Sequence, residues 1–213
     1  MTFEAYPKVA RLRRDCTITE KIDGTNAQVF IQTEADYVDA GPEAGPSVSR
    51  MDVNGETFYV QAGSRKRWLT YTADNFGFAK WVCDHTLDLV RVLGVGRHYG
   101  EWWGQGIQRK YGLDHKRFSL FNTGKWQEYK PASSGDINVF DTRDMAPECC
   151  HVVPVLYKGT FYDDDIETAA GLLSNRGSFA APDWDGQPEG IMIWHHAARV
   201  QMKWTFGGDG HKS

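Results

Sequence analysis

The sequence predicts a mixed α+β fold built around antiparallel sheet. Short apolar or alternating runs bounded by turn residues recur along the chain, and only two segments have the spacing of a helix. At 213 residues and 24.1 kDa, the chain can build one sizeable core and little else. No internal repeat or interdomain linker interrupts it. We therefore expect a single domain over residues 1–213, rich in antiparallel sheet and carrying a few packed helices.

The strands are predicted from runs rich in β-branched and aromatic residues, each bounded by turn residues. They are Thr17–Lys21, Gln28–Gln32, Phe58–Ala62, Arg97–Trp102, Phe118–Phe121, Val152–Tyr157, Gly190–Trp194 and Arg199–Lys203. The segment Asp39–Gly55 is rich in Gly and Pro, which predicts a loop between two strands, and Ala132–Gly135 is predicted as a second loop.

Two helices are predicted between the strands. The first has a possible N-cap at Asp74 and ends at Gly94. Its buried face consists of Ala79, Val82, Thr86, Leu89, Val90 and Leu93. The second begins in the acidic run 163–165, whose carboxylates suit the positive end of a helix, and ends before Gly177.

The composition excludes several classes of protein. Hydrophobic residues make up 41% and charged residues 24% of the chain, which excludes global disorder. No apolar run is long enough for a membrane helix or a signal peptide, so we expect a cytoplasmic protein with no membrane partner. The net charge of -4 and pI of about 6.0 supply no overall attraction to nucleic acid. Phosphate-binding loop, dinucleotide-fold, zinc-protease and serine-hydrolase motifs do not occur.

A lysine at the end of the first predicted strand is the leading catalytic candidate. Lys21 lies within the run Glu20-Lys21-Ile22-Asp23-Gly24-Thr25-Asn26. A lysine becomes a nucleophile only when burial or neighbouring cations lower its pKa from about 10.4. The alternative is an exposed lysine at a hairpin corner, so other segments must supply the neighbours.

Five further short motifs follow in order along the chain. They are Gly63-Ser64-Arg65, Tyr99-Gly100-Glu101-Trp102, Arg117-Phe118-Ser119-Leu120-Phe121, Pro188-Glu189-Gly190-Ile191-Met192-Ile193 and Val200-Gln201-Met202-Lys203. With the Lys21 motif they resemble the collinear motifs I, Ia, III, IIIa, IV and V of the covalent nucleotidyltransferases. That superfamily comprises ATP-dependent DNA ligases, RNA ligases and mRNA capping enzymes. The resemblance extends over nearly the whole chain and implies a ligase adenylation domain.

The residues after Lys21 favour one branch of this superfamily. Gly24-Thr25-Asn26 looks like the RNA ligases, in particular the phage-type ligases that seal nicks in double-stranded RNA. ATP-dependent DNA ligases usually carry an arginine where this chain has Asn26. Three alternatives stay open: a small ATP-dependent DNA ligase, a capping-type guanylyltransferase, and a non-catalytic nucleic-acid-binding module that keeps the ligase fold.

The resemblance implies a three-step reaction. Lys21 attacks the α-phosphorus of ATP, expels pyrophosphate and holds AMP covalently. AMP then passes to a 5′-phosphate, and a 3′-hydroxyl displaces it to join the strands. Each step requires Mg²⁺ or Mn²⁺. The implied partner is nucleic acid, as RNA ends or a nicked duplex, and the implied protein is a monomer, encoded by a phage or a cell.

The resemblance also assigns roles to individual residues. The implied nucleotide contacts are Glu20, Asp23, Gly24, Asn26, Arg65, Glu101, Phe118, Glu189 and Gln201. Among them, the Arg65 guanidinium suits phosphate oxygens, whether of the nucleotide or of a 5′-phosphate end. Phe118 would stack on the adenine, although a phenylalanine beside Leu120 and Phe121 is by default a core residue.

Metal and phosphate contacts are implied for two of these glutamates and for one further lysine. Glu189 and Glu101 are implied metal contacts, because hard carboxylate oxygens suit Mg²⁺ and Mn²⁺. By strand alternation Glu101 shares a face with Tyr99, and Lys203 lies opposite the apolar side of its strand. Lys203 would stabilise charge on the phosphoryl group and help to lower the pKa of Lys21.

Two departures from the family pattern concern the end of the chain. The last motif usually contains two lysines, and the first of these positions is Gln201, which can donate a hydrogen bond but carries no charge. Only residues 204–213 follow that motif, so we expect no appended OB-fold or helical domain. Strand binding would then depend on this domain or on a partner. Several basic runs could line a strand-binding face: Arg11 to Arg14, Arg65 to Arg67, Arg109-Lys110 and Lys116-Arg117.

Overall fold

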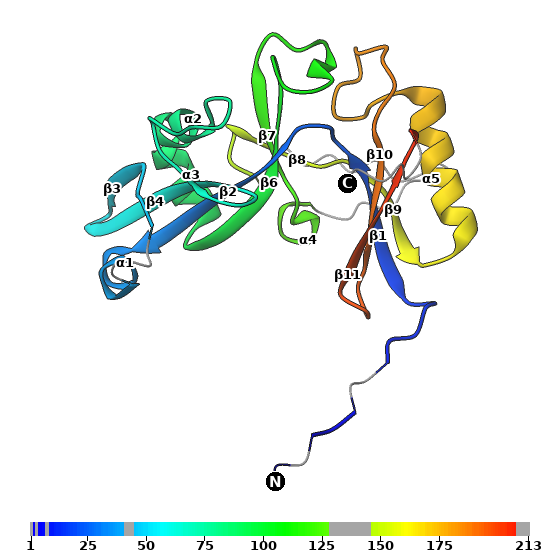
Figure 1. Cartoon of the computed structure of the whole chain (residues 1–213), viewed down its shortest axis with the longest axis horizontal. Helices are drawn as coiled ribbons and strands as arrows, with labels where there is room; N and C mark the ends of the chain where they lie inside the picture. The colour runs from blue at the N-terminus through cyan, green and yellow to red at the C-terminus, as the bar shows by residue number, and fades with distance from the viewer. Residues whose placement is uncertain (1, 3, 7–8, 41–44, 128–145, 208–213) are drawn as a thin grey trace. The chain divides into compact units, whose positions relative to one another are not determined.

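The computed structural model describes residues 2, 4–6, 9–40, 45–127 and 146–207, which form two compact units. Unit 1 contains the described residues up to 21 together with 154–207, and unit 2 contains 22–127 and 146–153. In unit 1 one helix packs against the β-sheet, and in unit 2 helices lie on both faces of the sheet (Figure 1). The predicted α+β class, rich in antiparallel sheet, is confirmed. No helix in the described part of the chain is both long and apolar enough to cross a membrane.

Unit 1 is a four-stranded antiparallel sheet with one long helix. Its strand order is β11 (Val200–Thr205), β10 (Gly190–His195), β1 (Asp15–Lys21) and β9 (Val155–Thr160). Helix α5 (Asp163–Arg176) begins in the acidic run and ends at Gly177, as predicted. Its residues Ala169 and Leu173 pack on Ile18 and Ile193 of the sheet.

Unit 2 is a seven-stranded sheet in which one pair of strands is parallel. The strand order is β3 (Ser49–Val53), β4 (Glu56–Ser64), β2 (Thr25–Thr33), β6 (Gly96–Gly104), β7 (Lys116–Leu120) and β8 (Cys150–Val152), with β5 (Trp68–Leu69) also paired to β4. Strands β7 and β8 form the parallel pair. The helices are α1 (Glu34–Ala40), α2 (Phe78–Asp84), α3 (Thr86–Leu93), the 3₁₀ turn η2 (Lys110–Gly112) and α4 (Thr123–Trp126).

The sheet of unit 2 has a core face and a polar face. On β2, Ala27, Val29 and Ile31 are buried with residues of α2 and α3, and the residues between them are only partly buried. Since side chains alternate along a strand, Asn26, Gln28 and Phe30 lie on the opposite face. That polar face carries several of the predicted site residues.

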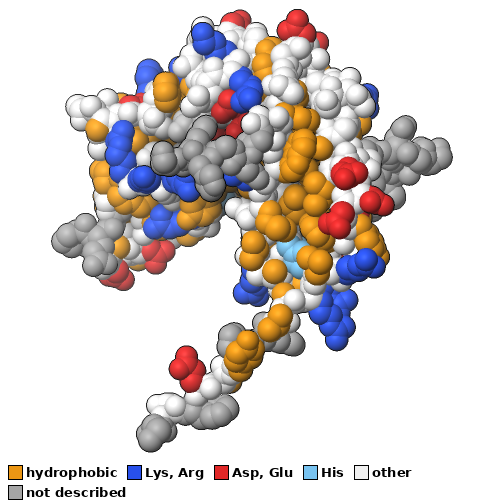
Figure 2. Space-filling view, turned by 45° about the vertical axis from the view of Figure 1, so that its right-hand side comes forward, with side chains coloured by type: hydrophobic (Ala, Val, Ile, Leu, Met, Phe, Trp, Pro, Cys, Tyr) orange, Lys and Arg blue, Asp and Glu red, His pale blue; other side chains and the backbone are white. Residues whose placement is uncertain are grey.

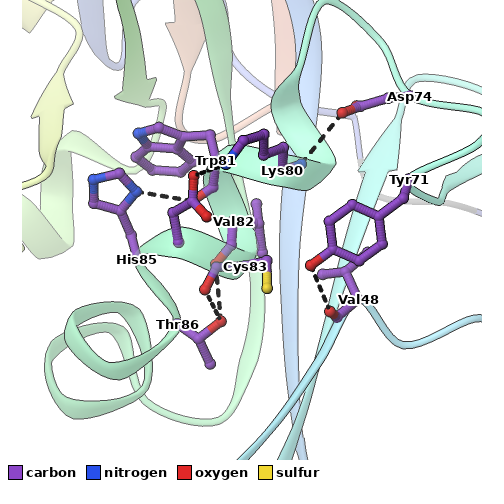
Figure 3. A network of polar contacts seen from close by, with 10 residues as sticks. Val48, Tyr71, Asp74, Lys80, Trp81, Val82, Cys83, His85 and Thr86 are labelled. Atoms are coloured by element: carbon purple, nitrogen blue, oxygen red, sulfur yellow. Dashed lines mark hydrogen bonds and ion pairs between the residues drawn. The ribbon is translucent and has the colours of Figure 1, made fainter.

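The predicted first helix is two helices. The predicted residues are buried, together with Phe78, but the chain breaks at His85, whose φ and ψ are −110° and 14°. The imidazole of His85 bonds the Trp81 carbonyl, and the Thr86 hydroxyl donates to the carbonyls of Val82 and Cys83 (Figure 3). The Trp81 carbonyl also accepts from the His85 N–H at 3.1 Å, so the His85 and Thr86 side chains add hydrogen bonds to carbonyls of the last turn of α2.

Asp74 caps this segment from outside the helix. The N-cap position is Gly77, but the Asp74 carboxylate accepts from the backbone N–H groups of Ala79 and Lys80. Figure 3 shows Asp74 reaching toward the start of α2. Asp74 therefore caps the helix as predicted, because these N–H groups have no partner within the helix. It does so from three residues before the N-cap position and not from that position itself.

One strand prediction and one loop prediction are corrected. The run Val152–Tyr157 is interrupted at Pro154, which has no N–H to donate, and its halves are β8 in unit 2 and β9 in unit 1. The predicted loop Asp39–Gly55 contains β3, which pairs with β4 through a two-residue turn at Asn54-Gly55, both with positive φ. The predicted loop Ala132–Gly135 lies outside the described residues.

Candidate functional site

The predicted site residues form one group in each unit. Unit 1 carries Glu20, Lys21, Glu189, Gln201 and Lys203, and unit 2 carries Asp23, Gly24, Asn26, Arg65, Glu101 and Phe118. The segment after Lys21 leads from the last residue of β1 in unit 1 to the first strand of unit 2. Each group has its own geometry.

In unit 1, Lys21 and Glu189 form an ion pair although 168 positions separate them in the sequence. The Lys21 Nζ donates to Glu189 Oε2 at 2.5 Å, and the two side chains are 22% and 18% exposed. Cross-strand pairing of Lys21 with Gly190 brings the two charges together. An ammonium held in this way has no free electron pair, so nucleophilic attack by Lys21 requires the ion pair to open and a proton to leave.

Lys203 lies on the same face of this sheet as Lys21. In the register, Thr19 of β1 is opposite Met192 of β10, and Met192 is opposite Lys203 of β11. Thr19 and Lys21 share a face by alternation, so Lys203 faces the same side, one row away. The two lysines lie two strand spacings apart, about 10 Å across the sheet, which allows both long side chains to reach one anionic group.

Gln201 lies one row further from Lys21 than Lys203 does. It is exposed and opposite Trp194, which in turn pairs with Thr17. The register also puts Met202 opposite Ile193, a core residue, so Lys203 does point away from the apolar side of β11. Gln201, at the first of the two positions where the family usually has lysine, is therefore farther from Lys21 than Lys203 is.

Gly190 permits the close approach of β11 to Glu189. A Cβ atom on Gly190 would lie 2.1 Å from the Trp204 carbonyl oxygen, and the φ of this residue is +152°. Beside it, the Phe206 N–H donates to the Glu189 carbonyl at 3.0 Å. Any other residue at position 190 would push β11, and Lys203 with it, away from the ion pair.

Glu20 points to the opposite face from Lys21 and is 1% exposed. Its carboxylate accepts hydrogen bonds from the Ser178 hydroxyl at 2.5 Å and from the N–H groups of Phe179 and Ala180 at 2.9 and 3.0 Å. Burial raises the pKa of Glu20, and these hydrogen bonds act against that rise. The carboxylate anchors the segment after α5, so a nucleotide contact through this side chain would require these bonds to break.

We expect Glu20→Ala to destabilise the chain by about 3 kcal/mol, because it leaves three donors without their charged acceptor. Glu20→Gln should cost much less, since its amide oxygen can accept from both N–H groups and its amide nitrogen can donate to Ser178. Urea unfolding of the two variants measures the difference. Equal losses would show that the charge, rather than the hydrogen-bonding shape, holds this segment.

The same comparison has a defined pH dependence. Because the folded pKa of Glu20 is raised above 4.5, the folded chain retains a proton that the unfolded chain releases as the pH rises past this value. The stability of the wild type relative to Glu20→Gln is therefore greatest below pH 4.5 and falls as the pH rises through the raised pKa. A difference that grows with pH would contradict this.

In unit 2, Asp23 and Gly24 are fixed by neighbours that the sequence did not identify as partners. The Asp23 N–H donates to the Tyr111 hydroxyl at 2.7 Å, and the Asp23 carboxylate forms an ion pair with Arg109. A Cβ atom on Gly24 would lie 2.6 Å from the Trp102 carbonyl oxygen, so this position requires glycine. Arg109 stood out in the sequence only as part of a basic run, and nothing there signalled Tyr111.

Asn26 and Glu101 are direct cross-strand neighbours on the polar face of unit 2. They pair between β2 and β6, and Tyr99 and Trp103 share their face, as alternation predicts. Arg65 is exposed and follows the last residue of β4. The structure thus brings Asn26 and Glu101 together.

Phe118 is corrected from an adenine-stacking residue to a core residue. Its ring is fully buried, with centroids 5.1 Å from the ring of Phe78 and 5.6 Å from that of Trp81. Alternation along β7 turns its neighbour Ser119 to the other face, where it accepts from Trp103 Nε1 at 2.9 Å. A ring enclosed in this way has no face available to a nucleotide.

The two predicted metal contacts lie in different units. No group of three or more His, Cys, Asp or Glu side chains that could hold a metal occurs among the described residues. Mg²⁺ is commonly held by one or two carboxylates together with substrate phosphates and water, and a single carboxylate fits that chemistry. Glu189, which is partly exposed beside Lys21, fits it in unit 1.

Comparison with known proteins gives one family and one fold. A family model described as RNA ligase matches residues 14–205. Three solved structures of RNA ligase variants from Naegleria gruberi have the same fold: two with ATP and manganese, both with a TM-score of 0.51 and 13% identity, and one with AMP and manganese, with a TM-score of 0.50 and 14% identity. The matches cover 91–92% of this chain and 50% of each ligase, so the chain spans about half of their length. No curated protein matches the chain.

Proposed function

The chain belongs to the RNA ligase family, and we propose that its residues 1–213 form one nucleotidyltransferase domain that transfers AMP from ATP to RNA through Lys21. The finer assignment, to ligases that seal nicked double-stranded RNA, is also proposed. It is supported by Asn26, which stands where ATP-dependent DNA ligases usually have an arginine.

The arrangement of Lys21, Glu189 and Lys203 on one sheet supports the proposal most directly. A lysine nucleophile requires a carboxylate or water to take its proton and cations to neutralise the phosphates. Glu189 contacts the Lys21 amine, and Lys203 projects from the same face. Three motifs far apart in the sequence thus supply the groups that a phosphoryl transfer uses.

In the proposed first step, the neutral Lys21 Nζ attacks the α-phosphorus of ATP. A nitrogen–phosphorus bond forms, the bond from the α-phosphorus to the bridging oxygen breaks, and pyrophosphate leaves with that electron pair. The nitrogen loses its remaining extra proton to solvent or to Glu189. Lys203 faces the phosphates and offsets the charge that develops on them.

The proposed cofactor is Mg²⁺ or Mn²⁺, and Glu189 is the residue that would hold it in unit 1. When bound, the ion would neutralise phosphate charge and orient the leaving group. Glu101 would contact the ribose or a metal from unit 2. The structural relatives were solved with a nucleotide and manganese, which are the two ligands proposed here.

In the later steps AMP would move to a 5′-phosphate, and a 3′-hydroxyl would displace it to join the strands. Joining is proposed for RNA ends or a nicked duplex held by a monomer. Because the chain spans half of the ligases that it matches, strand joining by residues 1–213 alone is a separate proposal from AMP transfer.

The experiment that tests this function is incubation of the whole chain with α-labelled ATP and Mn²⁺ or Mg²⁺, followed by denaturing electrophoresis. We expect label that survives denaturation and is released by acid, as a phosphoramidate is. Parallel reactions with labelled GTP test the capping-type alternative, and joining of nicked RNA against nicked DNA tests the DNA ligase alternative. Absence of covalent label with either nucleotide would leave the non-catalytic binding module as the better explanation.

A further inference from the structure

The polar face of unit 2 continues beyond the predicted nucleotide contacts as two more rows of side chains. Strands β2 and β6 pair Asn26 with Glu101, then Gln28 with Tyr99, and then Phe30 with Arg97. Because every second residue of a strand shares a face, these three pairs lie on the same side of the sheet, about 7 Å apart along it. The second and third rows are not explained by the AMP-transfer reaction.

The Arg97 guanidinium lies close to two aromatic rings. Its guanidinium carbon lies 3.9 Å from the centroid of the Phe30 ring and 5.2 Å from that of Trp68, and these two rings stack at 6.1 Å. Its Nη1 donates to the Gln28 side-chain oxygen at 3.1 Å. Within the described parts of the chain, Arg97 has no carboxylate partner. A stacked and exposed guanidinium of this kind keeps donors available for a phosphate.

Tyr99 presents its ring to solvent beside Arg97. The residue is 48% exposed, and no described residue stacks on its ring or bonds its hydroxyl. Its backbone is held in place, because its carbonyl accepts from the Phe121 N–H at 2.9 Å and its strand β6 pairs with β2 on one edge and β7 on the other. An exposed tyrosine on rigid backbone is the kind of platform on which nucleic-acid bases stack.

Further positive charge borders this face. The loop after β4 carries Arg65 and Lys66, both exposed and without a carboxylate partner among residues 9–40, 45–127 and 146–207. β4 ends opposite Ala27, which lies between the first and second rows. Figure 2 shows Lys and Arg side chains gathered over unit 2, although the chain as a whole has a net charge of -4.

We propose that Tyr99 and Arg97 form a binding subsite for single-stranded RNA next to the nucleotide contacts, in which a base stacks on Tyr99 and its phosphate is bound by Arg97. This rests on the proposed function only in naming RNA as the substrate. Stacking on an aromatic ring combined with cations along the backbone is how proteins hold single strands without reading their sequence. The local positive charge favours a polyanion over an apolar or acidic peptide.

The test measures binding of a fluorescein-labelled single-stranded RNA to the whole chain by anisotropy, over a series of salt concentrations. Tyr99→Val removes the ring but keeps a residue that suits a strand. We expect its affinity for RNA to fall about five- to one-hundredfold with little change in salt dependence. Tyr99→Phe keeps the stacking face and should restore the affinity.

Arg97→Gln should act differently from the tyrosine variant. Loss of one phosphate contact makes the negative slope of log affinity against log salt shallower by about 0.7 for a single strand. Tyr71→Val is the matched control, because Tyr71 is 58% exposed and its hydroxyl donates to the Val48 carbonyl, outside the three rows. We expect its RNA affinity to equal that of the wild type.

Two results would overturn the subsite. If Tyr99→Val is folded, as judged by its thermal melting, and binds RNA with the wild-type affinity, no base stacks on Tyr99. If Tyr99→Val keeps its RNA affinity but is no longer labelled by ATP, the Tyr99 ring contacts ATP instead of RNA. The test is independent of AMP transfer: if the wild type takes no label but binds RNA in a Tyr99-dependent way, the proposed function fails and the subsite stands.

Discussion

Lys21→Ala is expected to abolish covalent labelling of the chain by α-labelled ATP. In the proposed reaction no other group replaces the amine, because the attack requires an uncharged nitrogen at this position. Lys21→Arg should also take no label, since a guanidinium stays protonated and is not a nucleophile. Denaturing electrophoresis after incubation with ATP and Mn²⁺ measures the label, and we expect a loss to background.

The control for this experiment is Lys80→Ala. Lys80 is an exposed lysine of α2 that pairs with Asp84 four residues on, so its loss removes one amine from the surface and leaves the site groups in place. It should label as the wild type does. Label that persists in Lys21→Ala would refute this lysine as the nucleophile, and mapping of the labelled peptide would then identify the true one.

Phe118→Ala is expected to destabilise the chain by about 3–5 kcal/mol, because it removes a fully buried ring and leaves a cavity. Phe118→Leu should cost less than about 1.5 kcal/mol, since leucine refills most of that space. Urea unfolding measures both values. The matched control is Phe76→Ala, because the Phe76 side chain is 51% exposed and its removal leaves no cavity.

The opposite pattern would restore the sequence-based role of Phe118. If Phe118→Ala unfolds at the same urea concentration as the wild type but loses labelling by ATP, the ring contacts the nucleotide rather than the core. Labelling is therefore compared well below the unfolding transition of each variant, with Phe118→Leu as the folded reference.

Local sequence signals predicted most elements of the fold. Alternation found the strands, and the acidic start and Gly177 bounded α5. The errors have physical causes that are partly visible in the sequence. Pro154 signals the end of a ladder, and Asn54-Gly55 is a two-residue hairpin turn, so both corrected segments carried their own signals. The break at His85 carried no such signal, because the apolar spacing of one buried helical face continues across it.

The residues of the candidate site were likewise predicted only in part. Order and spacing of the motifs identified Lys21, Glu189 and Lys203, and strand alternation put Glu101 on the face of Tyr99. Alternation separates two faces of a strand but does not reveal which one is buried. Phe118 was assigned to the nucleotide by the family resemblance, and only the structure shows that its face of β7 is packed against α2.

Residue types in a fixed order were enough to predict the RNA ligase family and the α+β class, and to propose the residues of AMP transfer. Which of these residues meet became visible only in the folded chain. The contact of Lys21 with Glu189, the anchoring of Glu20 by the segment after α5 and the Asp23–Arg109 ion pair join residues 86 to 168 positions apart. Such contacts follow from strand register and packing, which pair distant segments according to which faces are buried and not according to their order in the chain.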